Sequence, residues 1–224
     1  MLIAGPSLRI DRRSAVPALR PGEVLRLADV TVTPGGSGLD VARAAIALGA
    51  PGVLVAFLPG HTGRAAGELI ADEGIALTGV PVAGEIRSTC VIDEPGRATL
   101  LDEPPPPVDE GDWAAFEAAV AAGLNGHRTL VCAGSLPPGA PGDGYARLVR
   151  AAREAGRASV IEAGDLAPAA GADVVVSSRE DAAATLVAPG ARSAVVTAAV
   201  AAALEAGAGV DEAVRRGAAA AGDL

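Results

Sequence analysis

Two glycine-rich turns hold residues whose types and spacing could bind a polar ligand. The first turn, residues 34–38 (Pro-Gly-Gly-Ser-Gly), leads directly into an amphipathic stretch that starts at Leu39. Glycines let the backbone approach a ligand closely, and the first N–H groups of a helix attract an anion or a hydroxyl. The second turn, residues 133–139, follows a β-like run and opens another helix. Taken alone, each turn also fits an ordinary strand-to-helix connection.

The kinds of basic residue limit the chemistry of these turns. Neither turn is a GxGxxG fingerprint or a phosphate-binding P-loop, because no Gly-Lys-Ser/Thr follows. The chain contains no lysine, and all 18 basic residues are arginines. A lysine Schiff base and a lysine phosphate clamp are therefore excluded. The net charge of −9 argues against nucleic acid as a partner.

The cysteines and histidines give no sign of a metal site. Cys90 and Cys132 are far apart and have no CxxC spacing, so we expect neither a disulfide nor a metal. We interpret His61 as lying near a helix start and His127 as lying in a loop. No basic leader precedes an apolar run at the N-terminus, and the apolar run 194–204 is too short to span a bilayer. We expect a soluble cytoplasmic protein without membrane contact.

The elements that must position the turns alternate between short β-like runs and amphipathic helical runs. The β-like runs are rich in valine and do not alternate with polar residues, as expected of strands covered on both faces. They are Val53–Leu58, Thr129–Ala133, Ala158–Glu162, Asp173–Val176 and Ala194–Thr197. Helically spaced apolar stripes lie between them: Val41, Ala44, Ala45 and Leu48; Trp113, Phe116 and Val120; Tyr145, Leu148, Val149 and Ala152. This alternation predicts an α/β fold in which helices cover both faces of a mostly parallel sheet.

Two stretches break this rhythm. Residues near 11–33 and 87–101 alternate between polar and apolar residues, with turns at Pro21-Gly22 and Pro95-Gly96. We expect these stretches to form a small separate sheet, within one domain that spans residues 1–224.

The combination of motifs resembles the PfkB (ribokinase-like) carbohydrate kinases, especially the branch of 1-phosphofructokinases. The resemblance rests on GG-x-G-x-x-VARA-x-x-x-LG from Gly35, on GSLPPG from Gly134, and on further matches in the same order from about residue 5 to 187. It implies a three-layer ribokinase-like domain with a β lid, and ATP-dependent phosphorylation of a sugar or a sugar phosphate. It also assigns substrate-binding roles to Asp11, Gly35, Gly36, Ser37, Gly38, Asp40 and Arg87, and nucleotide-binding roles to Ser178, Asp181 and Thr197.

Several of these site residues depart from the family pattern. The lysine of the family's GGKG is Ser37 here, and the asparagine that follows is Asp40, whose charge would repel a sugar phosphate. The sugar-binding aspartate near the N-terminus has become Arg9, or has moved to Asp11. Arg87 matches the arginine that contacts the phosphate in this branch.

The largest departure is a missing turn. The family carries a G-A-G-D turn that supplies an anion hole and the aspartate base, and it normally precedes the last two helices. Here Thr197 leads almost at once into residues 200–206 and 210–221, which resemble those two helices, so we expect the catalytic segment to be deleted. Asp211 follows Gly207-Ala208-Gly209-Val210 and is an alternative base, although an early-turn carboxylate favoured by the helix dipole is the simpler interpretation.

Three functional classes remain open. We favour a degenerate, non-catalytic sugar kinase-like protein that keeps a cleft for a sugar or a sugar phosphate. The alternatives are an active kinase with a rearranged site, and a structural or regulatory dimerisation partner. No cofactor is expected unless the protein is active, in which case the resemblance implies Mg-ATP. Exposed edges of a β lid favour a homodimer through the lid.

Overall fold

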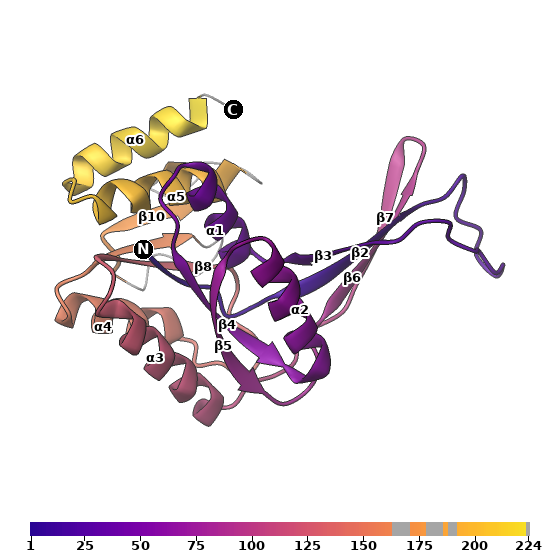
Figure 1. Ribbon diagram of the computed structural model, residues 1–224, viewed down its shortest axis with the longest axis horizontal. Helices are drawn as coiled ribbons and strands as arrows, with labels where there is room; N and C mark the ends of the chain where they lie inside the picture. The colour runs from indigo at the N-terminus through magenta and orange to yellow at the C-terminus, as the bar shows by residue number, and fades with distance from the viewer. Residues whose placement is uncertain (163–170, 178–185, 188–191, 223–224) are drawn as a thin grey trace.

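The computed structural model describes residues 1–162, 171–177, 186–187 and 192–222. Within them, the main sheet has seven strands in the order β11-β10-β9-β8-β1-β4-β5, and all neighbouring strands are parallel (Figure 1). The strands are β1 (Leu2–Ala4), β4 (Val53–Pro59), β5 (Ala76–Val82), β8 (Thr129–Ala133), β9 (Ala158–Glu162), β10 (Val174–Ser177) and β11 (Leu186–Val187). The predicted α/β fold with a mostly parallel sheet is confirmed.

Helices cover both faces of this sheet (Figure 1). On one face lie α1 (Ser37–Ala47), α2 (Gly60–Asp72) and α5 (Arg192–Glu205), with α6 (Val210–Gly222) packed against the outside of α5. On the other face lie α3 (Glu110–Leu124) and α4 (Gly144–Glu154). Strand β1 serves both layers, because Ile3 packs into the first core cluster while Leu2 and Ala4 pack into the second. The three-layer prediction is therefore correct.

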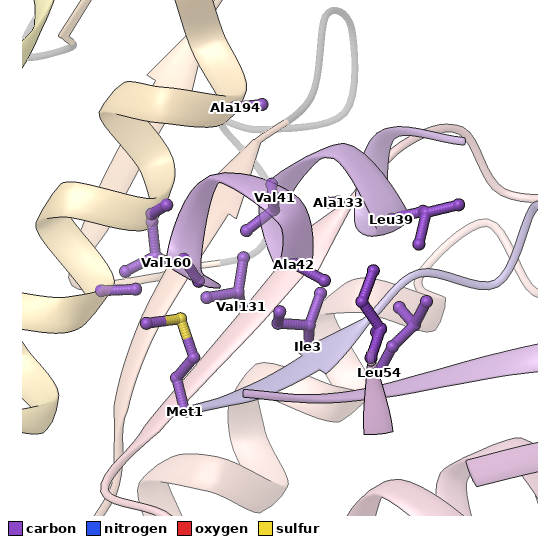
Figure 2. Close-up of a cluster of buried hydrophobic side chains, with 14 of the residues drawn as sticks. Met1, Ile3, Leu39, Val41, Ala42, Leu54, Val131, Ala133, Val160 and Ala194 are labelled. Carbon is purple, nitrogen blue, oxygen red and sulfur yellow. The ribbon is translucent and has the colours of Figure 1, made fainter. Parts of the chain in front are cut away.

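The two core clusters differ in composition. The cluster below α1 consists of aliphatic side chains and Met1 (Figure 2). The cluster on the other face contains Phe57, Trp113 and Phe116, whose ring centroids lie 4.8 to 6.3 Å apart. The stripes predicted for α3 and α4 are fully buried. The stripe predicted for α1 extends one residue too far, since α1 ends at Ala47 and Leu48 is 46% exposed.

The strand predicted at Ala194–Thr197 is wrong, because these residues lie in the first half of α5. The helix is enclosed by the sheet, α1 and α6, so nearly all of its side chains from Ser193 to Leu204 are buried. A helix that is apolar on every side has no amphipathic period, and a short apolar run within it looks like a buried strand. The alanines that continue to Ala203 favour the helix.

Three strands of the main sheet were not predicted: β1, β5 and the two-residue strand β11. Strand β5 is an edge strand that is half-exposed along its length and contains Gly79 and Pro81. Proline is tolerated at an edge, where its missing N–H breaks no ladder bond, but it weakens the strand pattern in the sequence. Strand β1 has three residues and is too short to show a period.

A second sheet projects from the body of the molecule, as predicted (Figure 1). Its described strands are β2 (Arg9–Ala15), β3 (Thr31–Gly35), β6 (Ser88–Glu94) and β7 (Arg97–Asp102), in the order β3-β2-β6-β7. Strands β2 and β6 are parallel, whereas β3 and β7 are antiparallel to their neighbours. Both predicted turns are present, with φ of 85° at Gly22 and 83° at Gly96. The described residues 16–30 between β2 and β3 form no strand.

Among the helices that the structure describes, none has the length and apolar character needed to cross a membrane.

Candidate functional site

The first glycine-rich turn is built by close backbone contacts. Gly36 is the N-cap of α1 and has a φ of 136°; a Cβ atom there would lie 2.7 Å from the carbonyl oxygen of Ser7. Gly38 packs against Gly5 at the end of β1, and a Cβ on Gly38 would lie 2.7 Å from the Cα of Gly5. The glycines therefore bring the start of α1 down onto the end of a central strand. As a glycine, Gly36 has no side chain that could cap this helix start.

The second turn lies beside the first. The N–H of Gly134 donates to the carbonyl oxygen of Glu162 at 3.2 Å. The buried Tyr145 hydroxyl lies 3.0 Å from the carbonyl oxygen of Ala133 and 2.9 Å from that of Gly134, so α4 fixes this turn from below. A Cβ on Gly134 would lie 3.4 Å from the Cβ of Ser37. The two motifs, about 100 residues apart in the sequence, thus meet at the carboxyl edge of the main sheet, where parallel α/β folds place their ligands.

One face of the small sheet forms an open polar groove with a volume of about 590 Å³. Alternate residues of β2 point to the same face, so Arg9, Asp11 and Arg13 line the groove together. Arg9 donates its Nε to Asp11 Oδ1 at 2.8 Å, and Arg13 pairs with Asp93. The remaining lining residues are Thr31, Thr33, Arg87, Thr89, Val91, Ala98, Leu100 and Asp102.

Arg87 lies next to Arg9 across the β2–β6 ladder, where the N–H of Ile10 donates to the carbonyl oxygen of Arg87. Its Nη1 reaches Asp102 Oδ2 at 3.3 Å, a long contact for an ion pair. Its Nε is buried and has no hydrogen-bond partner among the described residues. The guanidinium groups of Arg9 and Arg87 therefore form the cationic end of the groove.

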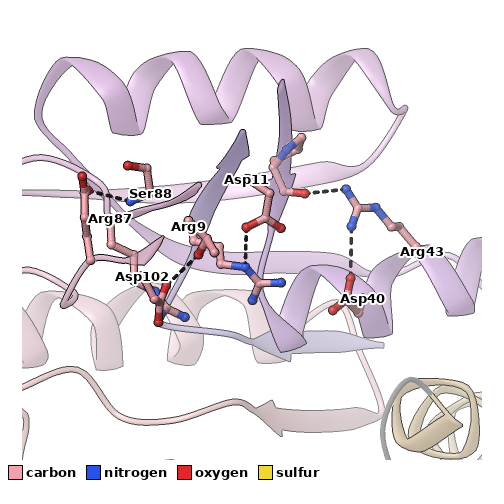
Figure 3. A network of polar contacts seen from close by, with 10 residues as sticks. Arg9, Asp11, Asp40, Arg43, Arg87, Ser88 and Asp102 are labelled. Carbon is pink, nitrogen blue, oxygen red and sulfur yellow. Dashed lines mark hydrogen bonds and ion pairs between the residues drawn. The ribbon is translucent and has the colours of Figure 1, made fainter. Parts of the chain in front are cut away.

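Arg43 organises the start of α1 (Figure 3). Its Nη1 donates to Asp40 Oδ1 at 3.0 Å, its Nη2 donates to the carbonyl oxygen of Pro34 at 2.8 Å, and its Nε donates to Glu73 at 2.7 Å. Burial raises the pKa of Asp40, while Arg43 and Arg9 act against this rise and Asp11 adds to it. Arg43 thus balances part of the negative charge of Asp40.

A second groove, with a volume of about 610 Å³, lies between α1 and α5. Ser37, Asp40 and Arg43 line it from α1, Ser193 lines it from α5, and Glu162 lines it from the end of β9. Ser193 Oγ donates to Glu162 Oε1 at 2.6 Å. Burial raises the pKa of Glu162, as does the nearby charge of Asp40, against the effect of the Ser193 hydrogen bond.

Glu162 is the residue that the sequence analysis missed. It was the last residue of a correctly predicted strand, and a carboxylate at the carboxyl end of a parallel strand is itself a signal for a site.

The predicted substrate-binding residues come together in the structure. Gly35 ends β3 opposite Arg9, and Gly36, Ser37 and Gly38 start α1. Asp11 lies close enough to Asp40 to influence its charge, and Arg87 lines the same groove as Asp11 (Figure 3). Their contacts with a ligand remain a prediction.

The predicted nucleotide-binding and catalytic residues are placed differently. Ser178 and Asp181 lie outside the described residues. Thr197 is fully buried in α5, in the segment for which a strand was predicted. Asp211 is exposed in the first turn of α6, at the opposite end of the molecule from the small sheet (Figure 1).

The nucleotide-binding roles expected of Ser178, Asp181 and Thr197 therefore stay predictions. No group of three or more histidine, cysteine, aspartate or glutamate side chains within the described ranges could hold a metal ion. The arginines and carboxylates of the groove on the small sheet suit anions and hydroxyl groups.

Comparison with known proteins identifies the scaffold that carries these grooves. Residues 5–200 match the model of the family described as pfkB family carbohydrate kinase. The chain belongs to the pfkB family. Among curated proteins, the ATP-dependent 6-phosphofructokinase isozyme 2 of Mycobacterium tuberculosis is 29% identical over 166 residues. That alignment covers 68% of this chain and 46% of the relative, so the chain matches less than half the length of this relative.

Solved structures of pfkB-like proteins share the fold. A possible 1-phosphofructokinase from Thermotoga maritima superimposes with a TM-score of 0.71 and 27% identity, over 83% of this chain and 62% of that one. Phosphofructokinase-2 from Escherichia coli, in its tetrameric inhibited form, gives a TM-score of 0.81 at 20% identity, over 98% of this chain and 92% of that one. The same enzyme in complex with fructose-6-phosphate gives a TM-score of 0.78 at 21% identity, over 99% of this chain and 92% of that one. Because these last two structures are less than 25% identical to this chain, their similarity shows the fold alone.

Proposed function

We propose that this pfkB family member binds a phosphorylated sugar between the small sheet and the start of α1, and that it does not transfer phosphate by the family mechanism. One observation carries the binding part of the proposal. Arg87 is mostly buried, its Nε has no hydrogen-bond partner among the described residues, and its ion pair with Asp102 is long at 3.3 Å. A buried guanidinium with an unused donor is stabilised by an anion whose oxygens accept from it, such as a phosphate.

The surroundings of Arg87 support this ligand class. Arg9 adds a second guanidinium, and Thr33 and Thr89 line the same groove with hydroxyl groups. Ser37 and Asp40 lie near the groove and can bind the hydroxyls of a sugar. One solved relative by fold is a complex with fructose-6-phosphate, which makes that compound a sensible probe.

The sequence and the placement of Asp211 support the non-catalytic part. The printed sequence contains no G-A-G-D turn. Asp211 is exposed on α6, which packs against α5, far from the small sheet (Figure 1). A general base must lie within hydrogen-bond reach of the hydroxyl that it activates, and a position on α6 away from the small sheet does not favour Asp211 for that role.

The binding test is calorimetric titration of the protein with fructose 6-phosphate, beside Arg87→Gln and the control Arg150→Gln. Arg150 is an exposed residue of α4, so this control changes the net charge equally without touching the groove. Charge-assisted hydrogen bonds contribute about 1.5–3 kcal/mol, so Arg87→Gln should weaken binding about 10- to 100-fold. Equal affinity of both variants for fructose 6-phosphate, or no binding by the unmodified protein, would contradict the proposed cleft.

The activity test is an ADP-release assay with Mg-ATP and either fructose 1-phosphate or fructose 6-phosphate, run beside Asp211→Ala. We expect no turnover from either protein, because general-base help alone is worth about 10²- to 10⁴-fold in rate. Turnover that Asp211→Ala abolishes would make Asp211 the base. Turnover that survives the substitution would show an active kinase that uses another residue.

We also propose that the protein is a homodimer through the small sheet. Strands β3 and β7 are the edges of this sheet. Leu100 and Leu101 on β7 are 61% and 59% exposed, and Val24 in the connection between β2 and β3 is 81% exposed. Exposed apolar side chains beside open strand edges favour pairing with a second copy.

A further inference from the structure

The groove between α1 and α5 adjoins the proposed sugar site but differs from it in charge. Ser37 lies in the first turn of α1 and Ser193 in the first turn of α5, and both line the groove. The N-terminus of a helix carries a partial positive charge and unpaired N–H groups, so two helix starts side by side would normally attract a phosphate.

In this protein, a carboxylate of the chain itself lies at the start of α5. Ser193 Oγ donates to Glu162 Oε1 at 2.6 Å, while Glu162 Oε2 is buried and has no hydrogen-bond partner among the described residues. The carbonyl oxygen of Glu162 accepts from the N–H of Gly134, which fixes the end of β9 against the second turn. Glu162 therefore sits where an anionic ligand of α5 would sit.

A second carboxylate, Asp40, faces the same groove from α1, close enough to raise the pKa of Glu162. The one arginine among the described lining residues is Arg43, and each of its three guanidinium nitrogens already donates to Asp40, Glu73 or Pro34. The chain has no lysine that could supply another positive charge. The described lining of the groove therefore has two carboxylates and no guanidinium left to bind an anion.

We infer that Glu162, together with Asp40, makes this groove reject phosphate, so that the cleft binds a sugar monophosphate and discriminates against a sugar bisphosphate. This inference rests on the proposed function. The single phosphate lies at Arg9 and Arg87 on the small sheet, and the hydroxyl end of the sugar points to the groove. There, carboxylate oxygens accept hydrogen bonds from hydroxyl groups, whereas a second phosphate meets two like charges.

The test compares fructose 6-phosphate with fructose 1,6-bisphosphate by calorimetric titration, in the unmodified protein and in Glu162→Gln. We expect the bisphosphate to bind about tenfold or more weakly than the monophosphate to the unmodified protein, because like charges a few ångströms apart repel strongly at a half-buried site. Glu162→Gln keeps the size of the side chain and removes the charge, so it should raise the ratio of bisphosphate affinity to monophosphate affinity about tenfold.

Two further variants make the result decisive. Glu154→Gln removes a charge from the exposed end of α4 and should leave the ratio of the two affinities unchanged. Asp40→Asn tests the same groove from α1 and serves if Glu162→Gln fails to fold.

The outcomes separate the two proposals. Equal binding of both sugars by the unmodified protein, or an unchanged ratio in both groove variants, overturns the inference and leaves the proposed function standing. Binding of neither sugar overturns the proposed function and the inference together.

Discussion

Arg43 illustrates what a single guanidinium achieves in a chain without lysine. It bonds Asp40 within α1, Glu73 at the end of α2 and the carbonyl oxygen of Pro34 in β3 (Figure 3). A planar fork with five N–H donors can satisfy three acceptors at once, whereas an ammonium group offers three donors around one point. Arg43 therefore joins the small sheet to two helices of the body and holds Asp40 at the site.

Thr197 provides a prediction at the scale of one residue. It is fully buried in α5, and its hydroxyl has no hydrogen-bond partner among the described residues. An unpaired buried hydroxyl costs about 1–3 kcal/mol, and valine has nearly the same shape without the oxygen. We expect Thr197→Val to raise the free energy of unfolding by about 1 kcal/mol and the melting temperature by about 2–4 °C.

The matched control is Thr89→Val, the same substitution at a hydroxyl that is bonded. Thr89 Oγ1 donates to Asp102 Oδ1 at 2.6 Å and the residue is 6% exposed, so this variant should lose stability. Both variants are compared by thermal and urea unfolding. A loss of stability in Thr197→Val would mean that its hydroxyl has a partner after all.

At the scale of an element, the start of α2 depends on a residue outside the helix. Its N-cap is Pro59, whose side chain cannot accept a hydrogen bond from the first N–H groups of the helix, and its first turn has no acidic residue. Glu85, from the connection between β5 and β6, accepts hydrogen bonds from the Thr62 hydroxyl and from the N–H groups of Thr62 and His61. These bonds, led by the Thr62 hydroxyl, lower the pKa of Glu85 to about 2.

This arrangement predicts a pH-dependent contribution to stability. Because the pKa of Glu85 is lower in the folded protein, its contribution is full above the ordinary glutamate value of 4.5 and is lost as the pH falls towards about 2. Glu85→Gln should therefore lower the urea midpoint of unfolding at pH 7. The gap in midpoint between this variant and the unmodified protein should narrow as the pH falls from 4.5 to 3. Urea unfolding across this pH range measures the gap.

Glu68→Gln is the control for this prediction, since Glu68 is an exposed residue of the same helix. It should change the midpoint little at any pH. A constant gap between Glu85→Gln and the unmodified protein from pH 7 to pH 3 would contradict the capping role of the Glu85 carboxylate.

At the scale of the whole molecule, the small sheet extends away from the three-layer body and exposes apolar side chains there (Figure 1). Leu101 is well placed for a test of the proposed dimer, because it is 59% exposed and does not line the polar groove. A buried charge without a partner is costly, so Leu101→Glu should shift the protein from dimer to monomer. Analytical ultracentrifugation over a range of concentrations measures this change.

Leu48→Glu is the matched control, since Leu48 is 46% exposed just after α1, away from the small sheet. It should leave the dimer intact. Monomeric unmodified protein, or a dimer that Leu48→Glu breaks and Leu101→Glu does not, would contradict pairing through the small sheet.

Local patterns in the sequence were sufficient to predict most of the fold. The valine-rich runs at β4, β8, β9 and β10, and the apolar stripes of α3 and α4, express periods that each segment carries within itself. The family resemblance of residues 5–187, confirmed by the match over residues 5–200, and the separate small sheet also depend on short stretches of sequence. The wrong strand prediction within α5 also comes from relying on local patterns. A helix that is enclosed on every side has no amphipathic period that would identify it.

The sequence alone therefore determined the layers, the family and the two turns that build the candidate site. Only the tertiary structure decided the charge of that site, because Arg43, which pairs with Asp40 within α1, also meets Glu73 at the end of α2, and Glu162 meets Ser193 of α5. Secondary structure follows from neighbours in the sequence, whereas the pKa and charge balance of a buried carboxylate follow from neighbours in space. For this reason the burial of Asp40, which raises its pKa, could not be predicted from the sequence, and Glu162 went unnoticed until the fold placed it in the groove.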